Sequence, residues 1–420
     1  MKKILISVLL FILFALSIGI VNSEPVKRGD INLDGDINSI DFALYKLYLL
    51  GGYQINDLTV ADLNGDGSAN SIDCAFLKMY LLGMISTFPA DEIATPTPTF
   101  PQTEDALLIP HKSWNCGMPE GIPKPEIGKL VFEADMKLDM VYNLGETPYG
   151  KRQVLIVKSG TVEGERIKGT VMSGGLDFQL DISNGVTEVE QILVIKTDDG
   201  RYMYIRSAGT GLNQNDLRMV PDIEVPKNGK YGWINNGKYV GRRIVDTAAK
   251  TMKIKVYDIS GIDLKSYSNN SVTVTKPENI PYQPWDYRKA NGERKGNVFI
   301  TEFVQLGDSQ SVGENKNGNR NIIPITGGYV TGSINAKILA AGADYQNLSN
   351  SMTIDARYLW QTDDGEIIIV RNGGQFGSLV PTFEVRKDSK YSFLNTNLYL
   401  SSDPSMGAGG VTITFYESRK

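Results

Sequence analysis

The sequence predicts a multidomain protein, in which a small all-α module built from two loop–helix units precedes two all-β antiparallel domains. Near the N-terminus, two similar polar loops are each followed by a segment with helical apolar spacing. The rest of the chain consists of short segments in which apolar and polar residues alternate, as in half-buried strands. Because the motifs of this second part occur twice, the β-rich region is expected to be duplicated.

Composition limits the possible functions. The chain of 420 residues is 41% apolar and has a formal net charge of -5, so it offers no basic surface for nucleic acid. Residues 1–23 contain two lysines, an apolar run and a small-residue end, which predicts a signal peptide, a secreted, extracellular protein and no membrane anchor after cleavage. His111 is the only histidine, which excludes a zinc site with several histidines and directs the search for acid–base groups to Asp, Glu, Lys and Tyr. The sequence leaves open whether Cys74 and Cys116 pair.

Both polar loops carry oxygen-bearing side chains at the spacing with which an EF-hand loop wraps Ca²⁺. Gly35 and Gly67 stand where such a loop turns sharply. The predicted ligands of the first loop are Asp30, Asn32, Asp34, Asp36, Asn38 and Asp41, and those of the second are Asp62, Asn64, Asp66, Ser68, Asn70 and Asp73. The sequence therefore predicts two Ca²⁺ ions, one in each loop.

Each loop precedes a helix, but no helix precedes the first loop. Residues 42–50 and 74–82 have apolar residues at helical spacing, and a glycine, Gly51 or Gly83, follows each segment. Residues 24–29 are too short a segment for a helix before the first loop, and Pro25 interrupts them. The unit is therefore a loop followed by a helix, repeated once.

These residues resemble a type I dockerin over about residues 24–86. The resemblance implies a cohesin domain of a scaffoldin as partner, and, because the two copies match, two alternative binding orientations. It implies cohesin contacts from Ser39, Ile40, Lys46, Leu47, Ser71, Ile72, Lys78 and Met79. A calcium-stabilised spacer and a calcium sensor are the alternatives, although sensors use complete EF-hand pairs.

The repeats in the remaining sequence set the expected domain boundaries. Residues 87–103 include a Thr/Pro-rich run, which predicts an extended linker. Thr197-Asp-Asp-Gly200 recurs as Thr362-Asp-Asp-Gly365, and Gly150-Lys-Arg152 recurs as Gly318-Asn-Arg320. We therefore expect one β-domain over residues 104–281 and a second over residues 282–420.

The second copy also contains Gly342-Ala-Asp-Tyr-Gln346 and Asp355-Ala-Arg-Tyr358. These motifs resemble a family of bacterial and fungal proteins known as domain of unknown function 3237. The resemblance implies a closed antiparallel β-barrel for each copy and no settled activity. The first copy departs from the family pattern where Ile192 replaces the arginine equivalent to Arg357.

The charged residues of the β-domains suggest a hypothesis for a catalytic site. Thr-Asp-Asp-Gly is first of all a hairpin turn. We hypothesise that Asp177 or Asp344 acts as general acid or base, with Glu190 or Asp355 as a second carboxylate. Arg206, Arg357 and Arg371, together with Arg152 and Arg320, would orient an anionic or polarised group. The alternative is that these charged residues form internal salt bridges between barrel strands.

Three classes of function fit the sequence. The first is an enzyme that acts on plant cell-wall carbohydrate: a hydrolase of glycosyl bonds, or a lyase or isomerase, that uses carboxylates without histidine. The second is a non-catalytic pair of carbohydrate-binding modules, whose duplication would raise avidity. The third is a structural or inhibitory cellulosome subunit. In each case the only cofactor expected is Ca²⁺, and the partners expected are a cohesin and cell-wall carbohydrate.

Overall fold

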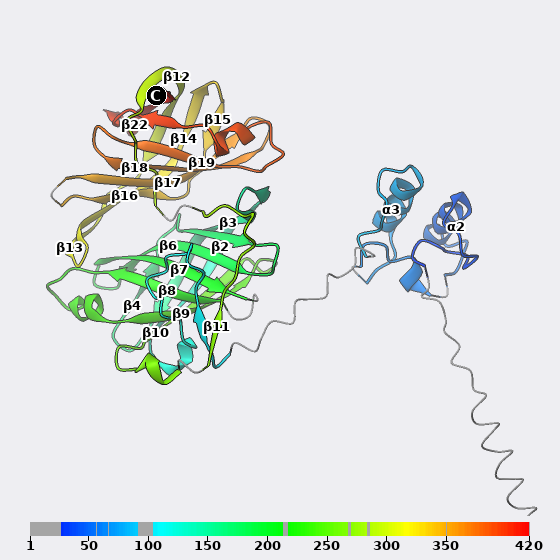
Figure 1. Ribbon diagram of the computed structural model, residues 1–420, viewed down its shortest axis with the longest axis horizontal. Helices are drawn as coiled ribbons and strands as arrows, with labels where there is room; N and C mark the ends of the chain where they lie inside the picture. The colour runs from blue at the N-terminus through cyan, green and yellow to red at the C-terminus, as the bar shows by residue number, and fades with distance from the viewer. Residues whose placement is uncertain are drawn as a thin grey trace, which may run out of the picture. The chain divides into compact units, whose positions relative to one another are not determined.

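The computed structural model describes residues 27–55, 57–65, 67–90, 104–212, 217–267, 270–283, 286–349 and 351–419 (Figure 1). The chain divides into two compact units, Met1–Thr99 and Phe100–Lys420. The predicted signal peptide and residues 91–103 of the predicted linker lie outside the described residues. Within the described ranges, no helix is long and apolar enough to cross a membrane.

The first unit contains the predicted loop–helix pairs. Its helices are α2 (Ser39–Leu49), the short 3-10 helix η1 (Leu58–Val60) and α3 (Ser71–Leu81). An asparagine caps each α-helix: the side-chain oxygens of Asn38 and Asn70 accept hydrogen bonds from the amides of Ile40 and Ile72, at 2.7 and 2.8 Å. These caps explain why each helix begins directly after its loop. The helices confirm the predicted all-α module.

The core of the first unit extends past its last helix. Phe88 is 1% exposed, and its ring lies 4.8 Å from the ring of Tyr80, measured between centroids. The amide of Ala90 donates a hydrogen bond to the carbonyl of Leu63. The packed part therefore reaches Ala90, inside the segment predicted as linker.

Nine antiparallel strands form the first barrel. They are β2 (Lys129–Thr147), β3 (Gly150–Glu163), β4 (Lys168–Val171), β5 (Leu176–Asp181), β6 (Thr187–Thr197), β7 (Tyr202–Gly211), β8 (Arg218–Glu224), β9 (Tyr239–Asp246) and β10 (Thr251–Asp258). Their order in the sheet is β2-β10-β9-β8-β7-β6-β4-β3-β5, and β2 also pairs with β3. Because β3 pairs with β2 on one side and with β4 and β5 on the other, and both β4 and β5 pair with β6, the strands form a closed ring.

The second barrel has the same plan. It consists of β12 (Arg294–Leu306), β13 (Gln310–Asn315), β14 (Gly318–Gly332), β15 (Ala336–Ile338), β16 (Ala343–Asn347), β17 (Thr353–Thr362), β18 (Ile367–Gln375), β19 (Val380–Glu384), β20 (Tyr399–Ser401), β21 (Ser405–Gly407) and β22 (Gly410–Arg419). The sheet runs from β19 to β20, and the amide of Ser401 donates to the carbonyl of Leu379 across the gap between these edges. The predicted all-β, antiparallel and barrel-like fold is confirmed for both copies.

Short elements fill the connections. They are β1 (Leu107–Ile109), β11 (Ser271–Thr273), and the 3-10 helices η2 (Pro125–Ile127), η3 (Gly232–Asn236), η4 (Leu264–Tyr267) and η5 (Ser392–Asn395). Strands β1 and β11 form a separate parallel pair. The predicted domain boundary at residues 281 and 282 falls between β11 and β12 and stays a prediction.

Two exchanged ion pairs join the barrels. Arg152 of the first barrel donates hydrogen bonds to both carboxylate oxygens of Glu384 in the second barrel, at 2.8 and 3.0 Å. Arg320 of the second barrel binds Glu224 of the first in the same way, at 2.8 Å for each bond. Arg152 and Arg320 occupy equivalent positions near the starts of β3 and β14, and Glu224 and Glu384 end β8 and β19. The two pairs are therefore one interaction repeated by an approximate twofold relation.

Apolar residues surround these pairs in the same symmetric way. One cluster joins Val154, Ile156, Leu176 and Phe178 of the first barrel to Leu359, Ile367 and Ile369 of the second. The other joins Ile192, Val194 and Tyr204 of the first barrel to Ile322, Ala343 and Tyr345 of the second. The barrels therefore meet through two apolar clusters, separate from the core of each barrel, and form a covalent pseudo-dimer.

We expect Arg152→Ala to lower the free energy of unfolding by about 3–5 kcal/mol, because it leaves Glu384 charged, buried and unpaired. Urea unfolding of the full chain measures this loss. Lys168→Ala, which removes an exposed pair with Glu163, serves as the control and should leave stability unchanged. A loss below about 1 kcal/mol for Arg152→Ala would show that the pair does not hold the barrels together.

Candidate functional site

The first polar loop is held by its own carboxylates. Asp30 accepts hydrogen bonds from the amides of Asp34 and Gly35, at 3.0 and 2.7 Å. Asp41 is fully buried, and its two oxygens accept from the amides of Ile31 and Asn38, each at 2.8 Å. Gly35 has a φ of 94°, which other residues rarely adopt, so the loop needs glycine at its sharp turn.

The second loop repeats this arrangement. Asp62 accepts from the amide of Gly67 at 3.0 Å, and Asp73 accepts from the amides of Leu63 and Asn70 at 3.0 and 2.9 Å. The predicted ligand Asp66 lies outside the described residues. The matching geometry of the two loops follows from the matching residues at each position.

The donor sets of both loops fit Ca²⁺. Their side chains offer only oxygen, from carboxylates, the amides of Asn32 and Asn64 and the hydroxyl of Ser68, which is the donor type that Ca²⁺ prefers. In the described part of the chain, no three His, Cys, Asp or Glu side chains gather closely enough to hold an ion alone. Each loop would therefore need amide oxygens and a main-chain carbonyl, that of Asp36 in the first loop, to complete the coordination.

The residues implied in cohesin contact lie on the surface of the first unit. Ile40 and Ile72, at the starts of α2 and α3, are 55% and 54% exposed. The other members are Ser39, Lys46, Leu47, Ser71 and Lys78, which are exposed, and Met79, which is half-buried. Two isoleucines exposed to this degree at equivalent positions form two apolar patches with the same chemistry.

Asp177 is paired inside the first barrel. Arg243 donates to both of its oxygens, at 2.9 and 2.7 Å, and the side-chain amide of Gln191 donates at 2.6 Å. The Asp177 side chain has no exposed surface. This environment matches the salt-bridge alternative rather than that of an acid or base open to a substrate.

Glu190 also lies among arginines, at the contact between the barrels. Arg206 of its own barrel lies at 2.8 Å, and Arg371 of the second barrel at 3.1 Å. Arg357 of the second barrel binds both Glu190 and Asp355. Burial raises the pKa values of Glu190 and Asp355, but the guanidinium groups outweigh it and hold both below their ordinary values. The structure thus brings these five predicted residues together as an ion-pair network.

Asp344 differs from its counterpart Asp177. The side-chain amide of Gln346 donates to its Oδ2 at 2.7 Å, whereas its Oδ1 is buried without a hydrogen-bond partner among the described residues. Burial raises the pKa of Asp344 to about 7. Of the predicted acid–base residues, Asp344 is the one whose proton would come and go near neutral pH.

Glu302 is a second unusual carboxyl group in the second barrel. It is fully buried and accepts hydrogen bonds from the Tyr358 hydroxyl at 2.6 Å and the Trp360 indole at 3.1 Å. Burial raises the pKa of Glu302 to about 8. Sequence reasoning missed this residue, although a glutamate at an inward position of an otherwise apolar strand alternation was a usable signal.

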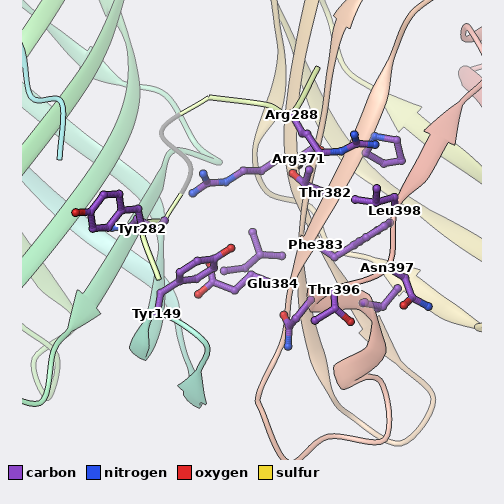
Figure 2. A pocket seen from close by; sticks show the side chains of 15 residues that line it. Tyr149, Tyr282, Arg288, Arg371, Thr382, Phe383, Glu384, Thr396, Asn397 and Leu398 are labelled. Atoms are coloured by element: carbon purple, nitrogen blue, oxygen red, sulfur yellow. Dashed lines mark hydrogen bonds between the residues drawn. The ribbon is translucent and has the colours of Figure 1, made fainter. Parts of the chain in front are cut away.

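A cavity of about 300 Å³ lies where the barrels meet. Figure 2 shows Tyr149 and Tyr282 on one side and Phe383 and Leu398 on the other, with Arg371 also in the wall. Aromatic rings beside polar groups suit a small polar ligand. The sequence did not reveal this cavity, because its wall combines residues from both barrels and the segment between them.

The two cysteines are free thiols. Cys74 is buried in the core of the first unit, and Cys116 is buried against the first barrel. Burial raises the pKa of the Cys116 thiol to about 11, so this side chain stays protonated at neutral pH. The structure therefore assigns both residues to packing.

Comparison with known families identifies both parts of the chain. The type I dockerin domain matches residues 28–82. The family described as protein of unknown function (DUF3237) matches residues 128–259 and 296–378, just over half of the chain. The chain therefore belongs to the DUF3237 family and carries a type I dockerin, the calcium-binding module that docks on the cohesins of a cellulosomal scaffoldin.

Individual relatives cover shorter stretches. A UPF0311 protein of Bradyrhizobium diazoefficiens is 41% identical over 91 residues, which are 21% of this chain and 60% of that protein. A putative endoglucanase X of Acetivibrio thermocellus is 51% identical over 39 residues, which are 9% of this chain and 17% of that protein. The chain thus spans less than two thirds of the length of these relatives. A solved structure of a Clostridium acetobutylicum protein of unknown function is similar with 27% identity and a TM-score of 0.29, over 31% of this chain and 98% of that chain.

The raised pKa of Glu302 predicts a pH dependence of stability. The folded state keeps this proton up to about pH 8, whereas the unfolded chain loses it near the ordinary value of 4.5. Between these values the unfolded state binds fewer protons, so this group lowers stability as pH rises. We expect Glu302→Gln to reduce the fall in unfolding temperature between about pH 5 and about pH 8.

Thermal unfolding of wild type and variant at both pH values measures this difference. Glu163→Gln, at an exposed carboxylate, is the control and should keep the wild-type pH dependence. An equal pH dependence in wild type and Glu302→Gln would show that Glu302 is ionised in the folded protein.

Proposed function

We propose that this protein is an extracellular cellulosome subunit, whose dockerin, loaded with two Ca²⁺ ions, brings a duplicated β-barrel body to plant cell-wall polysaccharide. In this proposal, the second barrel acts on a carbohydrate or a derivative of one. The type I dockerin match supports the docking step, and the environment of Asp344 supports the catalytic step. The proposed catalytic role is not carried over from any relative.

The docking step follows from the two matching loops. Each loop would hold one ion with its predicted ligands, and the ion would offset the repulsion between carboxylates that otherwise opposes folding of the loop. Ile40 and Ile72 then offer equivalent exposed contacts. Either copy would present the same chemistry to a cohesin, which gives two binding orientations.

We therefore expect Ile40→Asp or Ile72→Asp alone to retain most cohesin binding, since the other copy remains. The double variant should lose binding, because a charge then lies in the contact of both orientations. Calorimetric titration with a matched cohesin in calcium buffer measures this difference. Chelation of calcium should abolish binding by the wild type as well. Loss of binding in one single variant would argue against equivalent faces.

The catalytic step is assigned to Asp344. A general acid or base works best when its pKa lies near the working pH, and burial raises the pKa of Asp344 to about 7. Asp177, at the equivalent position, is neutralised by Arg243. The proposal therefore places the reaction in the second barrel and leaves the first as a supporting copy.

We expect Asp344→Asn to lower turnover about 10²- to 10⁴-fold, the usual range for loss of one general acid or base. The assay is a screen of cell-wall glycans and oligosaccharides in which products are detected by mass spectrometry. Asp403→Asn, at an exposed carboxylate of the same barrel, is the control and should keep wild-type turnover. Unchanged turnover in Asp344→Asn would overturn the proposed catalytic role.

Carbohydrate binding without turnover is a second candidate function. Phe303 and Tyr329 are paired across β12 and β14, with ring centroids 5.8 Å apart, and Tyr329 is 57% exposed. Such rings suit the apolar faces of sugars. Across β2 and β3 of the first barrel, Asp135 pairs with Thr161, and Asp135 forms an ion pair with Lys253 of β10. Retention of the Asp344→Asn protein on insoluble cellulose or xylan, with no turnover by the wild type, would favour this function.

A further inference from the structure

The cavity of about 300 Å³ between the barrels has no part in the proposed reaction, because Asp344 does not line it. One wall is formed by β18 and β19, whose register places Arg371 opposite Thr382. Other lining residues come from the first barrel and from the segment between the barrels (Figure 2): Tyr149, Tyr282 and Arg288. Small-molecule sites have volumes of about 300 to 1,000 Å³, so this cavity has room for a single ring rather than for a polymer.

The charged groups in the wall favour an anionic ligand. Among the described residues that line the cavity, Arg288 and Arg371 are the cationic side chains and Glu384 is the acidic one. Both oxygens of Glu384 accept hydrogen bonds from Arg152, and Oε1 also accepts from the Thr147 hydroxyl at 2.8 Å. The lining carboxylate is therefore neutralised from outside the cavity and does not offset the two lining arginines.

Arg288 uses only part of its guanidinium group. Its Nη1 donates to Glu293 at 2.8 Å and to the carbonyl of Lys289 at 3.3 Å. Its Nη2 is buried and has no hydrogen-bond partner among the described residues. A buried donor without an acceptor is costly, and the rare cases in folded proteins call for a missing partner. An anionic group in the cavity that Arg288 lines would supply the acceptor.

Arg371 shares its acidic partner with two other arginines. Its Nη2 lies 3.1 Å from Glu190, which also binds Arg206 and Arg357. Burial lowers the pKa of Arg371, and the attraction of Glu190 does not outweigh it. Burial acts in the same direction on Arg206, but there Glu190 and Asp355 outweigh it and the pKa is raised. Arg371 therefore has the weaker acidic compensation of the two.

The first barrel carries an acid where the second barrel does not. Arg206 lines a pocket of about 330 Å³ and lies opposite Asp222 in the register of β7 and β8. Arg371 holds the same position in β18, but the residue opposite it on β19 is Thr382, which has no charge. The first barrel thus places its own carboxylate in this pocket, whereas in the second barrel a carboxylate would have to come from a ligand.

The rest of the wall suits an organic ring held in one orientation. Tyr149 and Tyr282 contribute aromatic rings, which suit the apolar face of a sugar, and the loop after η5 adds hydroxyl and amide groups. Gln283, also in the wall, is fixed at both ends of its side chain. Its oxygen accepts from Arg152 at 2.7 Å, and its nitrogen donates to Glu188 at 2.8 Å. A wall fixed before binding costs a ligand little ordering.

We propose that this cavity binds one uronic acid, a pyranose ring that carries a carboxylate, with the carboxylate beside Arg288 and Arg371 and the ring against Tyr149 and Tyr282. Guanidinium groups bind carboxylates through paired N–H bonds, which suits arginine at both positions. An inorganic anion would satisfy the arginines but would leave the aromatic part of the wall without contacts. The sugar class of the ligand rests on the proposed function, whereas its charge and size rest on the cavity.

Calorimetric titration of the full calcium-loaded chain with D-glucuronate and D-galacturonate tests this site. We expect a dissociation constant below about 10 mM for at least one uronate, and binding of D-glucose, which lacks the carboxylate, at least about tenfold weaker. Sodium chloride matches the ionic strength of the titrations, since salt screens charges. No binding of either uronate at about 10 mM, or equal binding of glucose, would overturn the proposal. Inorganic phosphate that binds as tightly as the uronates would overturn the assignment to a sugar.

The variant Thr382→Asp gives the second barrel the acid that the first barrel has. We expect it to weaken uronate binding at least about tenfold, because the new carboxylate competes for the arginines. Thr326→Asp, at an exposed position of the same barrel outside the cavity, adds the same charge and should leave the affinity unchanged. Thermal unfolding checks that both variants are folded.

A second variant tests the unpartnered nitrogen directly. Arg288→Lys keeps a cation for Glu293 but removes the second nitrogen of the fork, so uronate binding should again weaken while glucose binding stays the same. Uronate affinity unchanged in both Thr382→Asp and Arg288→Lys would overturn the proposed site.

The outcomes separate this site from the catalytic proposal. Uronate binding that Thr382→Asp weakens, together with no glycan turnover by wild type, would support the cavity site and overturn the catalytic role of Asp344. Turnover that Asp344→Asn abolishes, together with no uronate binding by wild type, would support the catalytic role and overturn the cavity site. Uronate binding that is lost in Asp344→Asn but kept in Thr382→Asp would place the ligand at Asp344 and also overturn the cavity site.

Discussion

The exchange of ion pairs between the barrels is the interaction on which the body of this protein depends. The pair of Arg152 with Glu384 is buried, and the reverse pair of Arg320 with Glu224 is partly buried. Both pairs are bidentate, so neither barrel satisfies these charges alone. Buried charges are costly unless they are paired. Each barrel therefore needs the other, and the apolar clusters beside the pairs can form only when the two barrels are docked.

The two copies differ inside the barrels more than at the contact between them, because the contact requires complementary charges. Positions at the contact must keep complementary charges, whereas positions inside each barrel are free to differ. The first barrel closes its inner row with Arg243 on Asp177. The second leaves Asp344 open and also buries Glu302. The equivalent carboxyl groups Asp177 and Asp344 therefore lie in different electrostatic environments, although the fold around them is the same.

The docking module obeys a different physical rule. Its loops are organised by side chains close in sequence, such as Asp30 and Asp41, which bind the amides of their own loop. Its core is small, and clustered carboxylates oppose folding until a cation offsets them. The two parts of the chain are therefore stabilised in different ways: a bound cation would stabilise the dockerin loops, and the exchanged ion pairs stabilise the barrels.

The sequence alone determined the features that depend on local spacing: the two loops and their helices, the alternation that makes strands, and the repeat that makes two barrels. It also singled out Asp177, Asp344, Glu190 and the arginines as either catalytic residues or partners in internal salt bridges. Only the tertiary structure decided which of these charges are paired, because Arg243 meets Asp177 across a closed barrel and Arg357 meets Glu190 between barrels. Such partners are brought together by barrel closure and docking, which hydrophobic periodicity along one chain does not encode.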